Sequence, residues 1–247
     1  RTISFDTMWM ICKKEWQQFF SSLTGYIALA VFLLLNGLML FVFPDTSILE
    51  FGYASLSGFF NLAPWVLLLM VPTITMRSFA DEFKSGNFEI LRTLPLTPSQ
   101  LVLGKFFGAI LITFCAVVPT LIYAVSVQQL SVTGGIDIGA TIGSYIGLLL
   151  LGAVFTAIGI CTSSFTSNTV VAFITGAFVC FLLYNGFDAI SKLSVFSGGL
   201  DYYLEMLGIS FHYRSMSRGV VRISDLIYFI GIIYFFLLIT QRNLLKR

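Results

Sequence analysis

Residues 106–127 read FFGAILITFCAVVPTLIYAVSV and contain no Asp, Glu, Lys or Arg. A helix needs roughly 20 apolar residues to cross the hydrocarbon core of a membrane, and this run is long enough. Because lipid offers no partner to free backbone N–H and C=O groups, a segment of this kind must form a helix. The sequence therefore predicts an integral membrane protein.

Five further apolar runs share this character: residues 23–43, 59–76, 140–161, 170–187 and 226–240. The last run is short, so we expect its helix to extend into both flanks. Only 11% of the 247 residues are charged, whereas a typical soluble domain has about 25%. We predict an all-α membrane protein in which residues 1–247 form one domain with six transmembrane helices.

The Lys and Arg residues predict the orientation of the spans, because cytoplasmic segments are enriched in them. With both termini inside, the inner side holds ten of the fourteen basic residues: Arg1, Lys13, Lys14, Arg77, Lys84, Arg92, Lys105, Arg242, Lys246 and Arg247. The other four lie in one segment, residues 188–225, which we expect to be an outer loop with short helices. The first residues lack the pattern of a signal peptide, so insertion is expected to rely on the spans.

Residues 6–22 have an amphipathic pattern. Apolar side chains recur at helical spacing and polar ones fill the other face: Trp9, Cys12, Trp16, Phe19 and Leu23 against Lys13, Lys14, Gln17 and Gln18. This pattern predicts a helix that lies in the inner membrane interface. The alternative is an extended first span, although two lysines are costly in lipid.

Between the second and third spans, residues 75–100 read TMRSFADEFKSGNFEILRTLPLTPSQ. Apolar residues at helical spacing predict two short helices within residues 77–98, with Gly86 between them and Pro95 as a stop. Thr97 and Gln100 predict a capping box that begins the next helix. On the pattern alone, this cytoplasmic hairpin either binds a partner or merely connects two spans.

The same segment resembles the signature of type-two ABC transporter permeases, D-E-x-K-x-G-x-x-E-x-L-x-T-x-P followed by Gly-Lys at 104–105. In that family the hairpin couples the spans to a separate ATPase. The resemblance implies an ATPase-coupling role for these residues: Phe79, Asp81, Glu82, Lys84, Gly86, Glu89, Leu91 and Pro95.

Further segments resemble one branch of that family, the gliding-motility ABC transporter permeases of Bacteroidetes. They are VFPD at 42–45, NLAPW at 61–65, TITMRSFADE at 73–82, YNGFDAI at 184–190 and FHYRSMSRGVV at 211–221. Residues 1–7 fall outside the resemblance. The branch implies an exporter subunit in a bacterial inner membrane, with both termini cytoplasmic, and leaves lipid, polysaccharide and protein open as cargo.

Energy must come from a partner, because the sequence contains no G-x-x-x-x-G-K-[ST] loop for phosphates. We therefore expect no enzymatic activity, no catalytic residue, no metal site and no bound cofactor in this chain. ATP and magnesium would be used by an ABC ATPase subunit. Six spans imply pairing with a second permease subunit or a second copy. Membrane lipid is a further partner, and the lack of a basic tract argues against nucleic acid.

Uncharged polar residues in the spans are candidates for a translocation path: Asn36, Asn61, Tyr123, Tyr184 and Asn185. Hydrogen bonding between helices explains each of them equally well. An intramembrane enzyme would need a nucleophile with a base or paired carboxylates at membrane depth, yet the single histidine, His212, lies in residues 188–225. An ion-coupled carrier usually keeps an ionisable residue in its spans, and the span centres lack one.

Overall fold

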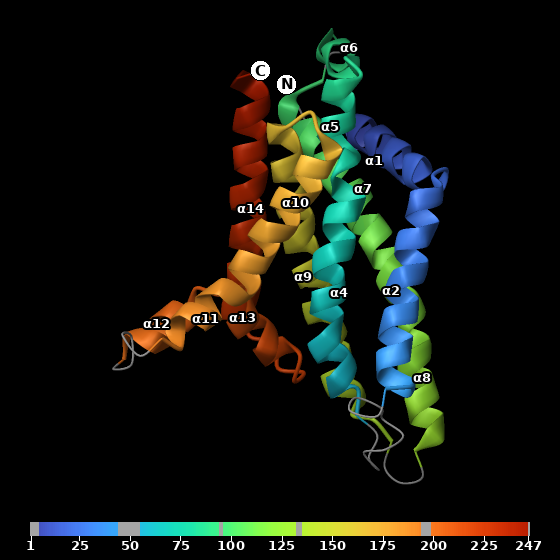
Figure 1. Cartoon of the computed structure of the whole chain (residues 1–247), viewed down its shortest axis with the longest axis vertical. Helices are drawn as coiled ribbons and strands as arrows, with labels where there is room; N and C mark the ends of the chain where they lie inside the picture. Colours follow the sequence, from blue (N-terminus) through green and yellow to red (C-terminus); the bar gives the residue numbers. More distant parts are fainter. Residues whose placement is uncertain (1–4, 44–54, 94–95, 132–134, 194–198, 247) are drawn as a thin grey trace.

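The computed structural model describes residues 5–43, 55–93, 96–131, 135–193 and 199–246, which are almost entirely helical (Figure 1). The 3₁₀ turn η1 and the π-helical turn η2 interrupt two of the spans. In chain order the elements are α1 Phe5–Phe20, α2 Leu23–Phe41, α4 Ser57–Thr75, α5 Arg77–Lys84, α6 Asn87–Thr93, α7 Pro98–Val117, η1 Val118–Thr120, α8 Leu121–Leu130, α9 Ile138–Phe165, α10 Thr169–Phe181, η2 Leu182–Gly186, α11 Phe187–Ser191, α12 Leu200–Met206, α13 Ile209–Met216 and α14 Ile223–Lys246.

Six helical segments are long and apolar enough to cross a membrane, which confirms the prediction. They are Leu23–Phe41, Ser57–Lys84, Pro98–Leu130, Ile138–Phe165, Thr169–Ser191 and Ile223–Lys246. The second and third segments are longer than predicted, because α5 continues α4 and because α7 begins at the capping box. The sixth helix extends beyond residues 226–240 on both sides, as expected for a short apolar run.

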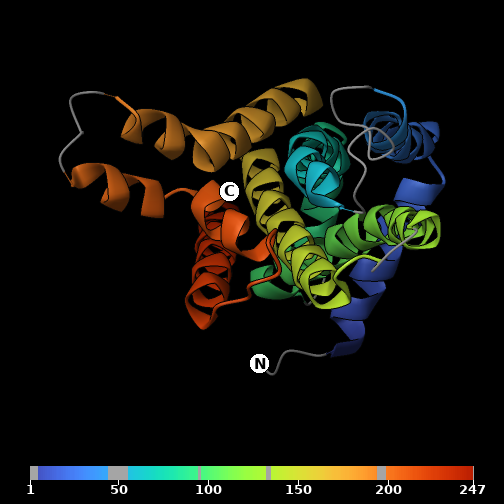
Figure 2. The same ribbon diagram turned by 90° about the horizontal axis from the view of Figure 1, so that it is seen from below.

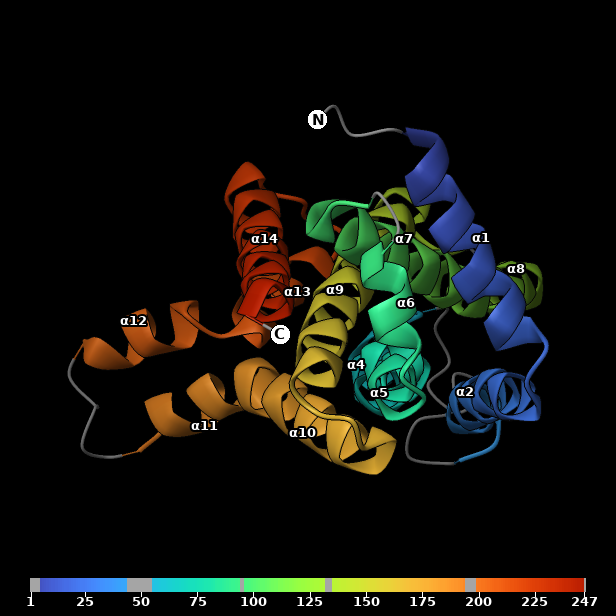
Figure 3. The same ribbon diagram turned by 90° about the horizontal axis from the view of Figure 1, so that it is seen from above.

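Helix α9 occupies the centre of the bundle, in contact with α4, α7, α10, α13 and α14 (Figures 2 and 3). Its small residues allow this close packing. A Cβ atom on Gly147 would come within 2.6 Å of the Met216 Cβ on α13, and one on Gly159 within 2.0 Å of the Thr75 hydroxyl on α4. Gly147 and Gly159 therefore let α13 and α4 approach α9 closely.

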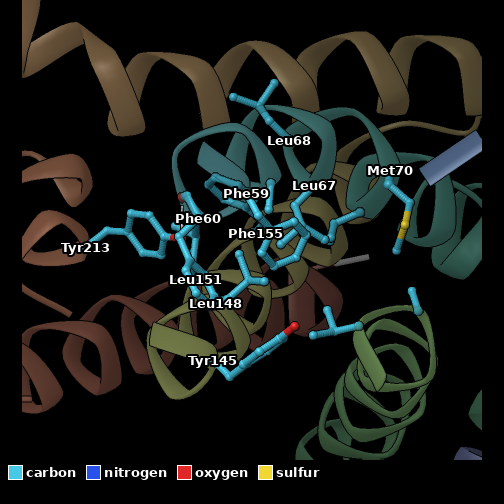
Figure 4. Packing of buried hydrophobic residues seen from close by; sticks show 14 of the residues in the cluster. Phe59, Phe60, Leu67, Leu68, Met70, Tyr145, Leu148, Leu151, Phe155 and Tyr213 are labelled. Atoms are coloured by element: carbon cyan, nitrogen blue, oxygen red, sulfur yellow. Dashed lines mark hydrogen bonds between the residues drawn. The ribbon is translucent and has the colours of Figure 1, made fainter. Parts of the chain in front are cut away.

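The core between α4, α9 and α13 is aromatic (Figure 4). Phe59 and Phe60 from α4 pack against Tyr145 from α9, with ring centroids 6.0 and 5.1 Å from the Tyr145 ring. Tyr213 reaches in from α13, and its hydroxyl donates a hydrogen bond of 2.8 Å to the Phe60 carbonyl. A buried phenol needs such a partner, so this bond fixes α13 against the bundle.

Two spans are interrupted. Pro119 lies in the 3₁₀ turn between α7 and α8, as expected for a residue that cannot donate to the helix ladder. The π-helical turn η2 follows α10, and beyond it α11 and α12 extend together away from the bundle (Figures 1 and 3).

The segment predicted as an outer loop, residues 188–225, contains the short helices α12 and α13. Residues 188–191 form the end of α11, and residues 223–225 begin α14.

Helix α1 and the last turn of α14 lie at the same end of the bundle as α5 and α6 (Figure 1). We call this the hairpin end. Since six is an even number of spans, this arrangement agrees with both termini on one side of the membrane. The predicted helix over residues 6–22 is present as α1, which lies along one edge of the bundle and packs against α7 (Figure 3).

Candidate functional site

The hairpin formed by α5 and α6 is the candidate functional site. Gly86 separates the two helices with a φ of +72°, a conformation that side chains with a Cβ rarely adopt. Three rings close the hairpin: Phe83 lies 6.0 Å from Phe79 and 4.8 Å from Phe88, between centroids. The sequence therefore placed both helices and their break correctly.

The predicted capping box at the start of α7 is confirmed. The Thr97 backbone N–H donates to the Gln100 Oε1 at 2.9 Å, and the Gln100 N–H donates to the Thr97 hydroxyl at 3.3 Å. These bonds satisfy two N–H groups that a helix start leaves without partners. Helix α7 consequently has a fixed start directly after the hairpin.

The first turn of α5 is capped from another helix. The backbone N–H groups of Phe79 and Ala80 both lie 3.1 Å from the Ser163 hydroxyl of α9, to which they donate. The same hydroxyl donates to the Met76 carbonyl at 3.0 Å. One side chain near the end of α9 thus serves both sides of the junction between α4 and α5, and holds the hairpin to the central helix.

A group of four charged residues, buried apart from Glu15 and Lys14, connects the hairpin to α1 and α7, and we call it the Lys105 cluster. The Lys105 ammonium donates to Glu15 Oε1 of α1 at 2.7 Å, to Glu82 Oε1 of α5 at 2.9 Å and to the Ser78 carbonyl at 2.6 Å. The Lys14 ammonium adds a contact of 3.0 Å to Glu82. The two carboxylates and two ammonium groups balance in charge.

The burial of each side chain decides which of these contacts contributes to stability. The Lys105 side chain is 1% exposed, whereas that of Lys14 is 53% exposed. An exposed ion pair contributes little to stability, but a buried charge that loses its partner is costly. The Lys105 ammonium also lies 4.9 Å from the centre of the Phe79 ring, a favourable cation–π position. Lys105 is therefore the residue on which the cluster depends.

Glycines on α7 make this arrangement possible. A Cβ atom on Gly104 would lie 2.8 Å from the Ile11 Cβ, and one on Gly108 would lie 2.9 Å from the Glu15 Cβ. These distances are too short for real side chains, so only glycine lets α1 approach closely enough. The approach brings Glu15 within reach of Lys105.

The residues predicted to couple to an ATPase separate into an exposed group and a buried group. Lys84, Gly86 and Glu89 are exposed at the tip of the hairpin, and Asp81 and Leu91 are half-buried. Within the part of the chain that the structure describes, Lys84 and Glu89 form no ion pair. Pro95 lies outside the described residues.

Phe79 and Glu82 differ from the exposed group. Both side chains are buried, Phe79 against the Phe83 ring and Glu82 in the Lys105 cluster. They hold the hairpin in place, and their role in coupling to an ATPase stays a prediction. Replacing Glu82 would therefore disturb the anchoring of the hairpin before it tested a contact with a partner.

The five candidates for a translocation path are spread over α2, α4, α8 and η2. The Tyr123 hydroxyl donates a hydrogen bond of 2.8 Å to the Leu33 carbonyl and so connects α8 to α2. The Asn36 amide donates a hydrogen bond of 2.7 Å to the Phe32 carbonyl, within α2. Asn61 is exposed near the start of α4.

Tyr184 and Asn185 lie in the π-helical turn η2, next to α4. The Tyr184 ring packs edge-on against Trp65 with centroids 5.7 Å apart. Hydrogen bonding or ring packing thus accounts for Tyr123 and Tyr184, and a path lined by all five residues stays a prediction without geometric support.

Sequence reasoning missed Glu15 and Ser163. Lys105 carried the signal for Glu15, because a lysine inside a membrane-spanning run usually has an acidic or carbonyl partner. Ser163 carried no signal, since serines at helix ends are common. His212 is hydrogen-bonded on both ring nitrogens: its Nδ1 lies 2.7 Å from Asp225 Oδ1 and its Nε2 lies 3.0 Å from the Met206 carbonyl.

Comparison with protein families agrees with this geometry. The family model of ABC-2 family transporter proteins matches residues 50–240, which include the hairpin and Lys105. The chain belongs to the ABC-2 transporter family. As a member of this family it is a multi-pass membrane permease of an ABC transporter, and ABC-2 permeases generally work with an ABC ATPase. A search of curated proteins gives no match. Helices α1 and α2 precede the matched residues.

Proposed function

We propose that this permease is the membrane subunit of an exporter in a bacterial inner membrane, driven by a separate ATPase that docks on the hairpin. The hairpin geometry carries the proposal. Its tip presents exposed charges, while its base is fixed to α1, α7 and α9 through the Lys105 cluster and Ser163. A push on the tip would therefore reach three helices together.

Charge supports cytoplasmic placement of the hairpin end. Among the described residues, Lys13, Lys14, Arg77, Lys84, Lys105, Arg242 and Lys246 lie on helices at this end, which the positive-inside tendency assigns to the cytoplasm. ATP and magnesium would be bound by the ATPase partner. A second membrane subunit would complete the transporter, and α2 and α10 offer exposed apolar side chains for it. Export and a role in gliding motility rest on the resemblance of five sequence segments.

The docking proposal is tested by reversing a charge at the tip. In Lys84→Glu we expect the ATPase to be lost during co-purification in mild detergent, because an exposed charge at a contact surface supports association. Arg218→Glu is the matched control, since Arg218 is exposed and precedes Gly219, whose backbone lies against the first turns of α9. The ATPase should remain bound to this variant.

ATP hydrolysis by the complex provides the second measurement. The Lys84→Glu chain should insert and elute from a sizing column like the unmodified chain, yet fail to alter hydrolysis by the added ATPase. Co-purification at the unmodified yield together with normal hydrolysis would show that the hairpin only connects two spans. Equal loss in both variants would point to a general defect and would count against docking at the tip.

A further inference from the structure

A polar cleft of about 250 Å³ opens at the hairpin end, beside the last turns of α1. The end of α1, the start of α2, the α4–α5 junction and α7 surround it. Its walls carry amide, hydroxyl and guanidinium groups, contributed by Gln18, Ser22, Thr24, Arg77 and Ser78. Such a density of polar groups is unusual beside membrane-spanning helices.

An apolar groove of about 460 Å³ continues from this cleft between α2 and α4, which run side by side (Figure 1). Thr24 and Thr73 line both spaces, so the cleft and the groove are contiguous. The groove is lined by exposed aliphatic side chains that include Val31 and Leu69. A polar space at a span end that leads into an apolar groove fits a molecule with a polar head and a hydrocarbon tail.

The charges of the cleft favour an anionic head. Arg77 donates to the Thr24 hydroxyl at 3.3 Å and forms no ion pair among the described residues. Glu15 also lines the cleft, but its carboxylate is bound to the buried Lys105 ammonium. The buried Ser78 hydroxyl has no hydrogen-bond partner in the described part of the chain. Arginine binds phosphate through two parallel N–H donors, and basic pockets between spans bind lipid headgroups.

We infer that the cleft and the groove form one phospholipid site, with the phosphate at Arg77 and an acyl chain between α2 and α4. The groove alone would suit a neighbouring protein helix equally well. The adjoining polar cleft favours a phospholipid, because an apolar helix would leave the Arg77 charge without a counter-ion and the Ser78 hydroxyl without a partner among the described residues. Lipid binding here is independent of ATPase docking at the hairpin tip.

Native mass spectrometry of the purified full chain in detergent tests the site. The probes are phosphatidylglycerol, phosphatidylethanolamine and a diacylglycerol with the same acyl chains. We expect both phospholipids to bind at least tenfold more tightly than diacylglycerol, because only they carry a phosphate. Inorganic phosphate added in excess should not displace them, since it lacks the chain that fills the groove.

Two variants probe the two halves of the site. Arg77→Gln should weaken phospholipid binding at least tenfold, and Arg242→Gln, which removes an exposed basic residue at the same end, should leave it unchanged. Leu69→Trp should fill the groove and weaken binding to a similar extent. Ile230→Trp, on an exposed position of α14, is its control. Sizing profiles and helical circular dichroism should match those of the unmodified chain.

Three results would overturn the inference. Unchanged phospholipid binding by Arg77→Gln and Leu69→Trp would show that lipid binds elsewhere. Equal binding of diacylglycerol, or displacement by inorganic phosphate, would contradict joint recognition of head and chain. Finally, a disulfide between two chains carrying Leu69→Cys, formed in membranes, would show that a second copy covers the groove.

Discussion

Replacing Lys105 with methionine should separate α1 and the hairpin from α7. The change removes the ammonium that Glu15 and Glu82 share, and leaves two largely buried carboxylates. Removing one partner of a buried ion pair costs about 3–5 kcal/mol. Lys14 still contacts Glu82, so we expect the lower end of that range. About 3 kcal/mol corresponds to a more than hundredfold change in the equilibrium between docked and separated states.

Unfolding in mixed micelles with a rising fraction of SDS would measure this cost. Two of the three tryptophans, Trp9 and Trp16, lie in α1, so fluorescence reports the separation of this helix. Lys14→Met is the matched control and should cost no more than about 1 kcal/mol, because that side chain is half exposed.

A neutral triple variant checks the cause. Glu15→Gln, Glu82→Gln and Lys105→Met together remove the buried charges, and should recover most of the lost stability because uncompensated burial is then avoided. If Lys105→Met unfolds at the same SDS fraction as Lys14→Met, the cluster does not stabilise the hairpin end and the reasoning is refuted.

Three further outcomes are expected. Gly86→Val should lower the free energy of unfolding by about 1–3 kcal/mol and reduce the amount of ATPase that co-purifies. Gly86→Asn should do neither, because asparagine tolerates positive φ. Equal behaviour of the two variants would rule out backbone strain as the cause. Burial, and then the charge of Glu15, raise the pKa of the Cys12 thiol. At pH 8 maleimide should therefore label Cys12 more slowly than a cysteine introduced by Ser85→Cys, and the two labelling rates should approach each other as the pH rises. Equal labelling rates at pH 8 would contradict this. Ser85→Cys and Gln129→Cys should be labelled from opposite sides of the membrane, the first from the cytoplasm, and labelling of both from one side would overturn the six-span topology.

The spans were predictable because lipid leaves the backbone few choices. A run such as residues 106–127 must form a helix wherever it lies, and its ends are shifted only by local signals. The capping box at Thr97 is one such signal, and it was found because its two bonds join residues three apart in sequence. The break at Gly86 was predictable for a similar reason, because the turn between the two short helices needs a positive φ at this one residue.

The function of Glu82 could not be predicted in this way. Its neighbours in sequence, Asp81 and Lys84, are charged, and the pattern of the hairpin gives no sign that Glu82 points inward. Its partners lie 68 and 23 residues away, at Lys14 and Lys105. Contacts of this range depend on how α1, α5 and α7 pack, and that packing depends in turn on Gly104 and Gly108.

The buried cluster gives the amphipathic helix α1 a place in the proposed coupling. An interfacial helix held only by lipid would slide when the hairpin moves. Here Glu15 shares Lys105 with Glu82, so α1 and α5 are bound to the same atom of α7. A displacement of α5 that kept this cluster intact would carry α1 and the first turns of α7 with it. Along the third span, the α-helix is first interrupted by the 3₁₀ turn that contains Pro119. Backbone hydrogen bonds have poorer geometry in a 3₁₀ turn than in an α-helix. We therefore expect α8 to move relative to α7 about Pro119 when the hairpin moves.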